Sequence, residues 1–133
     1  MTDERLVGRR YETRPFEVTE SSIRAYREAV GDAGRVDGLE APPTYAMVYD
    51  YDAYWQLWQD QEVAMDVAHL VHGEQRFKFH RAVRPGDRIK ASGRLSSVTR
   101  RGQMELVTYE IVSRDAEELP VSEATALFII RKP

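Results

Sequence analysis

The sequence predicts an α+β fold in which an antiparallel sheet wraps around one long helix. The prediction rests on a change in the spacing of apolar residues along the 133-residue chain. Before Gly73 they recur every three to four residues, as in amphipathic helices, and after it they alternate with polar residues, as in half-buried strands. The chain length suits one domain, so residues 1–133 are expected to form a single domain.

Two helices are expected in the first half of the chain. One spans Thr19–Val30, with a capping threonine at its start and a glycine after its last turn. A loop over Asp32–Glu40 leads to the second, which runs from Thr44 to about Gln61 after prolines suited to a first helical turn. Its bulky apolar stripe comprises Met47, Val48, Tyr51, Tyr54, Trp55 and Trp58. Such a helix must be covered over much of its circumference, which favours a place in the core for this stripe.

A short strand around Arg10–Val18 is expected before the first helix, and four strands are expected after Gly73. The four strands are placed at Arg76–His80, Ile89–Leu95, Met104–Ser113 and Val121–Arg131. We expect each to pair with its neighbour in the chain, which forms an antiparallel meander around the long helix. The last strand is apolar on both faces over Ala126–Ile130, so its outer face is expected to need cover from a partner sheet or a second subunit.

Composition excludes several classes of function. The formal net charge is −3 with acidic and basic residues interleaved, so no nucleic-acid partner is expected. The chain has no cysteine, and its three histidines lie along or beside one predicted strand, so neither a disulfide nor a metal site is expected. No apolar run approaches the roughly 20 residues of a membrane span, and the charged N-terminus does not resemble a signal peptide, so we expect a cytoplasmic protein. Motifs of serine hydrolases, kinases and dehydrogenases are absent.

Several motifs together resemble the N-terminal type of MaoC-like dehydratase domain. They are the run from His72 to Phe77, then Phe79-His80-Arg81 and Val83-Arg84-Pro85-Gly86-Asp87, preceded by Val30-Gly31-Asp32 and Ala41-Pro42-Pro43-Thr44-Tyr45. The likeness covers most of the chain and extends to mycobacterial accessory subunits of hydroxyacyl-carrier-protein dehydratases. Each motif alone is weak, and the specificity comes from their combination.

The resemblance implies a hot-dog fold, in which a sheet wraps a central helix and two such domains pair side by side. It implies an acyl thioester of coenzyme A or acyl carrier protein as substrate and no cofactor. It also implies a homodimer, or a heterodimer with a catalytic MaoC-like subunit. Active members add or remove water across the α,β bond of the thioester. That hydro-lyase chemistry needs a carboxylate and an imidazole to move protons, and a backbone N–H at the start of the central helix to polarise the carbonyl.

The chain departs from the family's catalytic pattern at two points. Asp32 matches the catalytic aspartate, but the Asn-Pro and the histidine that follow it in active members are missing from residues 33–41. At the helix start, Pro43 stands where active members usually have glycine, and proline has no N–H to donate. The N–H groups of Thr44 and Tyr45 are expected to be free and to be able to substitute for it.

The candidate catalytic residues are Asp32 and His72, the latter because it could approach a thioester from the first of the four strands. Their alternatives are a loop carboxylate and a partly buried histidine at a strand start. The candidate substrate-binding residues are Thr44, Tyr45, Tyr51, Trp55, Glu74 and Gln75. For the aromatic stripe the alternative is plain core, and for Glu74 and Gln75 it is a hydrogen-bonded pair at a subunit seam. The other histidines, His69 and His80, are expected to be structural.

The leading hypothesis is a subunit of an (R)-specific hydroxyacyl-thioester dehydratase, or enoyl-thioester hydratase, that lacks a complete catalytic dyad and pairs with a catalytic subunit. The main alternative is a non-catalytic homodimer that binds acyl-CoA. An active enzyme that uses Asp32 with His72 is a further alternative, and a thioesterase on the same fold is another.

Overall fold

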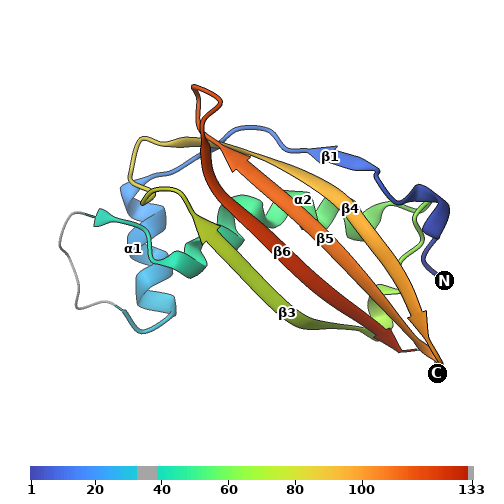
Figure 1. Cartoon of the computed structure of the whole chain (residues 1–133). Coiled ribbons are helices and arrows are strands. Elements are labelled where there is room, and N and C mark those ends of the chain that lie inside the picture. Colours follow the sequence, from blue (N-terminus) through green and yellow to red (C-terminus); the bar gives the residue numbers. More distant parts are fainter. Residues whose placement is uncertain (33–38, 132–133) are drawn as a thin grey trace.

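The sheet curls around the long helix α2, as the alternating sequence pattern predicts (Figure 1). The computed structural model describes residues 1–32 and 39–131. The helices are α1 (Glu20–Ala29) and α2 (Ala46–Gln59), with single 3₁₀ turns at Glu4–Leu6, Pro43–Tyr45 and Val67–His69. The strands are β1 (Arg10–Glu12), β2 (Phe16–Glu17), β3 (Leu70–Phe79), β4 (Arg88–Arg101), β5 (Met104–Arg114) and β6 (Pro120–Arg131). The loop predicted over Asp32–Glu40 falls mostly on residues 33–38, which lie outside the described residues.

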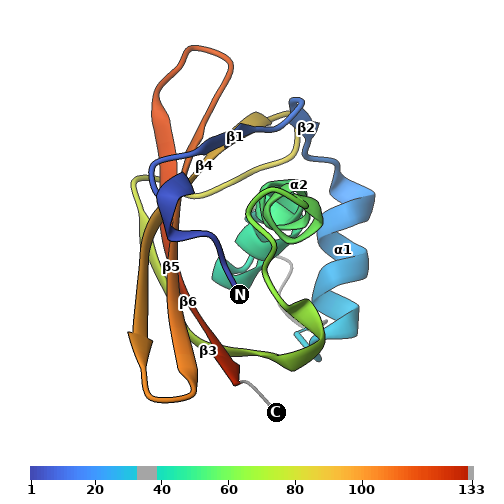
Figure 2. The ribbon, with the colours of Figure 1, turned by 90° about the vertical axis from the view of Figure 1, so that its right-hand side faces the viewer.

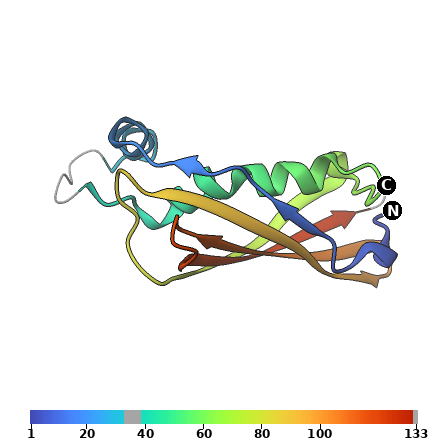
Figure 3. The same cartoon turned by 90° about the horizontal axis from the view of Figure 1, so that it is seen from above.

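The signals that predict α1 act as expected. The Thr19 side chain accepts a hydrogen bond from the Ser22 N–H at 3.1 Å, so it satisfies one of the free donors of the first turn. Gly31 adopts a φ of 79°, a left-handed conformation that glycine takes without steric cost just past a helix end. The helix α1 lies across the N-terminal end of α2 (Figure 3).

The strand order is β1-β4-β5-β6-β3, with all neighbours antiparallel and β2 also paired with β4. The predicted four-strand meander is therefore wrong in one place. β3 pairs with β6, from Leu70 opposite Ile130 to Phe79 opposite Ser122, and not with β4. The segment between Phe79 and Arg88 crosses from one side of the sheet to the other. The turn residues in this segment predict only that the chain bends there. They do not determine which strand β3 pairs with.

The helix α2 lies in the hollow of the sheet (Figure 2). Ala46, Ala53 and Leu57 are fully buried on this side, which allows the helix to approach the sheet closely. Tyr54 is also fully buried, as the core interpretation of the aromatic stripe predicts. That interpretation is wrong for Tyr51 and Trp55, which are 52% and 46% exposed. At 100° per residue these two positions fall on the far side of the helix from the sheet.

One hydrogen bond joins the middle of α2 to the centre of the sheet. The Tyr109 hydroxyl, on β5, donates to the Ala53 carbonyl at 2.8 Å, in a fully buried environment. Gly93 on β4 lies diagonally from Tyr109, opposite Ile111, and a Cβ atom added there would stand 1.9 Å from the Tyr109 hydroxyl oxygen. The tyrosine ring therefore needs a residue without a side chain at this position.

We expect Gly93→Ala to lower the free energy of unfolding by about 1–3 kcal/mol, because the new methyl group must displace a ring fixed on both sides. Urea denaturation followed by circular dichroism measures this. Gly73→Ala is the matched control, since its Cβ meets the flexible end of Ile129 on the outer face of the sheet. The control should change the free energy of unfolding by less than about 1 kcal/mol. Equal effects of the two substitutions would contradict the proposed packing.

A carboxyl group is buried in the same interface. Asp50 on α2 is fully buried and accepts a hydrogen bond from the Ser113 hydroxyl at 2.6 Å. Its second oxygen has no hydrogen-bond partner in the described part of the chain. Burial raises the pKa of Asp50 to about 7, and the hydrogen bond from Ser113 opposes this only in part. The side chain is therefore a neutral acid over much of the acidic pH range.

This burial predicts a pH dependence of stability. The folded protein holds the Asp50 proton up to about pH 7, whereas the unfolded chain releases it near the ordinary value of 3.8. Between these values the folded state binds more protons, so the contribution of Asp50 to stability falls as the pH rises. Relative to Asp50→Asn, the wild type should lose roughly 4 kcal/mol of unfolding free energy between pH 4 and pH 8. Urea titrations of both proteins test this, and a pH-independent difference would refute it.

The outer face of the sheet, opposite α2, carries no other element in the described residues (Figure 2). Leu127 and Ile129 point to this side and are half-buried. That they need a covering partner remains a prediction. None of the helices in residues 1–32 and 39–131 is long and apolar enough to cross a membrane.

Candidate functional site

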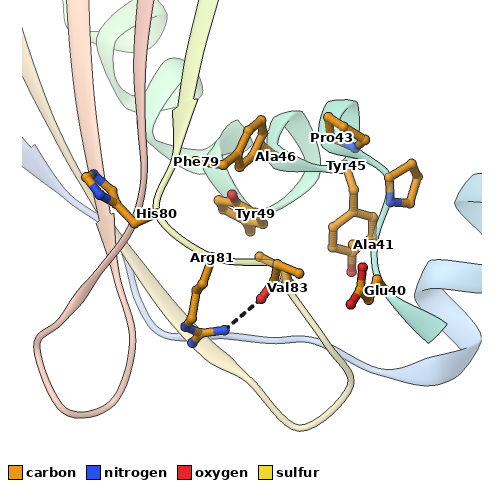
Figure 4. A pocket seen from close by; sticks show the side chains of 12 residues that line it. Glu40, Ala41, Pro43, Tyr45, Ala46, Tyr49, Phe79, His80, Arg81 and Val83 are labelled. Carbon is orange, nitrogen blue, oxygen red and sulfur yellow. Dashed lines mark hydrogen bonds between the residues drawn. The ribbon is translucent and has the colours of Figure 1, made fainter. Parts of the chain in front are cut away.

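A cavity of about 350 Å³ opens at the N-terminal end of α2 (Figure 4). One wall is the segment that enters the helix, from Glu40 to Ala46, and the other is the segment Phe79–Val83, where the chain leaves β3. The Ala41 N–H donates to the Val83 carbonyl at 2.8 Å and joins the two walls. The crossing of the sheet between β3 and β4 therefore builds the cavity.

The helix α1 holds the entering segment in place through two side-chain hydrogen bonds. The Tyr26 hydroxyl donates to the Thr44 hydroxyl at 2.6 Å. The Ser22 and Tyr45 hydroxyls lie 2.8 Å apart. Thr44 and Tyr45, both predicted to bind substrate, thus use their polar atoms to bind α1. Only Tyr45 lines the cavity.

The ionisable side chains of the cavity are all paired with charged neighbours. The pairs are His80 with Glu123 at 2.7 Å, Arg81 with Asp87 at 2.8 Å, and Glu40 with Arg84 at 2.6 Å. The contacts fix the Glu40 and Arg81 side chains, whereas His80 uses only its Nε2 in its pair, and its Nδ1 has no hydrogen bond to any described residue.

The two tyrosines of the cavity are paired as well. The Tyr49 hydroxyl lies 2.7 Å from the Ser122 hydroxyl on β6, in a buried environment. Burial raises the pKa of both Tyr45 and Tyr49 above the ordinary value for a phenol, so both remain neutral. The surfaces left for a ligand are the prolines of the entering segment with Phe79 and Val83. This lining suits an apolar group.

The start of the helix offers fewer free donors than the sequence suggests. Pro43 opens the 3₁₀ turn and has no N–H. The Tyr45 N–H donates to the Pro42 carbonyl at 2.9 Å, so the expectation that it is free is wrong. The 3₁₀ turn tightens the helix start and uses this donor internally. The Thr44 N–H has no hydrogen bond to any described residue.

The structure does not bring Asp32 and His72 together. Asp32 follows α1, and its N–H donates to the Arg27 carbonyl at 2.8 Å. The His72 ring lies 5.0 Å from the ring of Phe128 and 6.4 Å from that of Tyr54, beside the middle of α2. Neither residue lines the cavity. Their catalytic roles remain predictions.

A β-bulge at Gly73 sets the environment of His72. The register of β3 against β6 shifts between His72 and Glu74, so one extra residue is inserted. His72 and Gln75 therefore point to the same face although they are three residues apart. The His72 Nε2 lies 2.9 Å from the Gln75 Oε1, which also accepts a hydrogen bond from the Tyr54 hydroxyl at 3.2 Å. Gln75 thus connects the polar atoms of His72 and Tyr54 through hydrogen bonds, among aromatic rings at the edge of the sheet.

The remaining predicted binding residues lie outside the cavity. Tyr51 and Trp55 stack at 6.2 Å on the exposed side of α2. Glu74 is exposed and forms an ion pair with Arg76 on the outer face of β3. No hydrogen bond joins Glu74 to Gln75 in the described residues, because the two side chains point to opposite faces of the strand.

The predicted site residues leave out much of the cavity lining. Phe79, His80 and Val83 belong to motifs that carry the family resemblance, but alternation along a strand does not show that its end turns past a helix start. Tyr49 lies on α2 next to the predicted stripe, and residue spacing alone does not distinguish a tyrosine that lines a cavity from one in the core. Its place in the helix relative to the two prolines is the only sequence feature that locates it at the cavity.

Comparison with known proteins identifies the family. A model described as the FAS1-like dehydratase domain region matches residues 5–124. The chain belongs to this dehydratase-region family. It is 36% identical to a UPF0336 protein of Streptomyces coelicolor over 110 residues, which cover 72% of this chain and 73% of the relative. It is 34% identical to a UPF0336 protein of Leifsonia xyli in an alignment 139 positions long, which covers 95% of this chain and 93% of the relative.

Solved structures show the same fold as this dehydratase-region chain. One is the C-terminally truncated HadBC (3R-hydroxyacyl-ACP dehydratase) complex from Mycobacterium tuberculosis, with a TM-score of 0.78 and 22% identity over 93% of this chain and 96% of that one. Another is the MaoC-like dehydratase from Rhodospirillum rubrum, with a TM-score of 0.70 and 17% identity over 100% of this chain and 99% of that one. The hot-dog fold and the resemblance to MaoC-like dehydratases are confirmed.

Proposed function

We propose that this chain is the accessory subunit of a hydroxyacyl-thioester dehydratase, or enoyl-thioester hydratase. It shapes the apolar part of the acyl site, and a catalytic partner of the same fold supplies the aspartate and the histidine. The observation that carries the proposal is the cavity beside the helix start: neither Asp32 nor His72 lines it, and its Glu40, His80 and Arg81 side chains pair with charged residues outside it. Elimination of water removes a proton from the α carbon and delivers one to the departing hydroxyl, so it needs a base and an acid free to exchange protons.

The edge of the sheet supports a partner. β3 is ten residues long and pairs only with β6 among the described strands, so its other edge has free backbone donors and acceptors. Long unpaired edges of this kind are templates for another strand. The exposed apolar side chains include Val71 and Phe79 on β3, and Trp55 on α2. A second hot-dog domain would continue the sheet and cover these residues.

The same open edge fits a second copy of this chain, which favours the alternative of a homodimer that binds acyl-CoA without turning it over. Both hypotheses place an acyl chain against the apolar walls of the cavity. They differ in whether a catalytic partner is needed for chemistry.

The first test is enoyl-thioester hydration. The purified chain is mixed with crotonyl-CoA, and the loss of the enoyl-thioester absorbance is followed. The chain alone should give no rate above background, since neither Asp32 nor His72 lines the cavity. The same chain co-expressed with a hot-dog subunit that carries the complete Asp…Asn-Pro…His stretch should give robust hydration. Coenzyme A binding without turnover, whatever partner is supplied, would favour the homodimer alternative.

Robust hydration by the chain alone would overturn the accessory role. In that case His72→Ala discriminates further, because an unchanged rate would remove the alternative that pairs Asp32 with His72. The substitution should leave the fold intact, since the His72 side chain is exposed.

The second test concerns the partner surface. The Tyr51 and Trp55 rings stack with an interplanar angle of 18° and form an exposed aromatic pair of the kind that dominates binding at interfaces. Trp55→Glu should weaken association of the subunits by about tenfold or more, measured by sedimentation velocity over a range of concentrations. Leu119→Glu is the matched control, because Leu119 is also exposed but lies in the β5–β6 turn, and it should have no effect.

A further inference from the structure

Like charges face one another on the outer surface of the sheet, next to its β1 edge. Arg10 on β1 lies directly opposite Arg94 on β4. Lys90 on β4 lies directly opposite Arg114 on β5. Directly opposed like charges on one face of an antiparallel pair destabilise it. Two such pairs occur within one small area, in a chain whose formal net charge is −3.

A hollow of about 320 Å³ lies between these pairs, lined by Arg10, Ser92, Arg94, Glu110, Val112 and Arg114. Three of its six lining residues are arginines. Arg94 approaches Glu110 at 3.5 Å, the limit of a hydrogen bond. The side chains of Arg10 and Arg114 form no ion pair or hydrogen bond with any residue in the described ranges. Their guanidinium groups are therefore available to a ligand.

The lining carries a net positive charge. It holds three arginines against the one carboxylate of Glu110, while Lys90, Glu12 and Glu123 are cross-strand neighbours of lining residues. Glu12 accepts a hydrogen bond from the Ser92 hydroxyl at 2.6 Å. The surrounding side chains are partly exposed, so an anion can reach the hollow from solvent.

We propose that this hollow is a binding site for a phosphoryl group. Guanidinium groups present planar pairs of donors that match the oxygens of phosphate, and several of them together neutralise more than one negative charge. Binding of such an anion would also relieve the repulsion within the two opposed pairs. The phosphoryl group could belong to a free phosphorylated compound or to coenzyme A, since the two present the same chemistry. The site lies on the face of the sheet opposite α2, so it does not depend on the acyl-site proposal (Figure 2).

The experiment is calorimetric titration of the full chain with inorganic pyrophosphate, and separately with coenzyme A, at low ionic strength. Pyrophosphate should bind saturably at one site. Arg10→Gln and Arg114→Gln should each weaken binding by about tenfold, the effect of one lost charge-assisted contact. Glu110→Gln should strengthen it, because it removes the carboxylate that competes with the ligand for Arg94. Arg101→Gln is the control of equal charge change, at the far end of β4, and should leave the affinity unchanged.

If the affinity for coenzyme A changes across the variants as the affinity for pyrophosphate does, the phosphates of coenzyme A are a source of the ligand. Coenzyme A that fails to bind while pyrophosphate binds as described identifies a free phosphorylated compound. The proposal is overturned if pyrophosphate shows no saturable binding, or if Arg101→Gln weakens binding as much as the two hollow substitutions. It is equally overturned if Glu110→Gln does not strengthen binding.

Discussion

The hydrogen bond from the Tyr109 hydroxyl to the Ala53 carbonyl is the contact around which the rest of the molecule is arranged. It joins the centre of β5 to the middle of α2 at 2.8 Å, and it fixes the distance between helix and sheet. That distance requires Gly93 below the tyrosine ring and alanines on the facing side of the helix. The large aromatic side chains of the helix must then lie to the sides or on its far surface. The position of the cavity, at the helix start, follows from the same placement of α2.

The cavity lies at the start of the long helix, and its charged side chains pair with charged residues outside it. Its walls come from the segment entering α2 and from the segment leaving β3, which the Ala41 N–H joins to the Val83 carbonyl. His80 and Arg81 are bound to carboxylates of the chain itself, and Pro43 removes a backbone donor. Such a site can recognise the shape and apolarity of a ligand without moving protons. This combination is what an accessory role in a dehydratase would require.

Much of the fold could be predicted from the sequence, because helix and strand periodicity, caps and turns are local signals. The boundaries of α1 and the existence of all four long strands follow from such signals. The pairing of β3 with β6 could not, since alternation along Phe77 and Phe79 is the same whichever strand lies alongside. The exposure of Tyr51 and Trp55 depends on which face of α2 is small enough to meet the sheet. That choice is made by Ala46, Ala53 and Gly93, which hydrophobicity alone does not single out.

The candidate site was predictable only in its outline. The prolines before α2 mark the helix start where the cavity opens, and Tyr45, one of the predicted binding residues, lines it. The other lining residues depend on a chain crossing that joins two distant segments. The use of Thr44 and Tyr45 to bind α1 depends on where Ser22 and Tyr26 lie in space. Spacing along the chain carries no information about such contacts.

The bulge at Gly73 has a consequence for any strand that joins the open edge of β3. A regular edge accepts a neighbour in several alignments, because sliding by two residues restores the same pattern of donors and acceptors. The extra residue between His72 and Glu74 breaks that translational symmetry near one end of the edge. An incoming strand that slid along would place its own regular backbone against the irregular one and lose contacts. The bulge would therefore favour a single register for any strand that pairs with this edge.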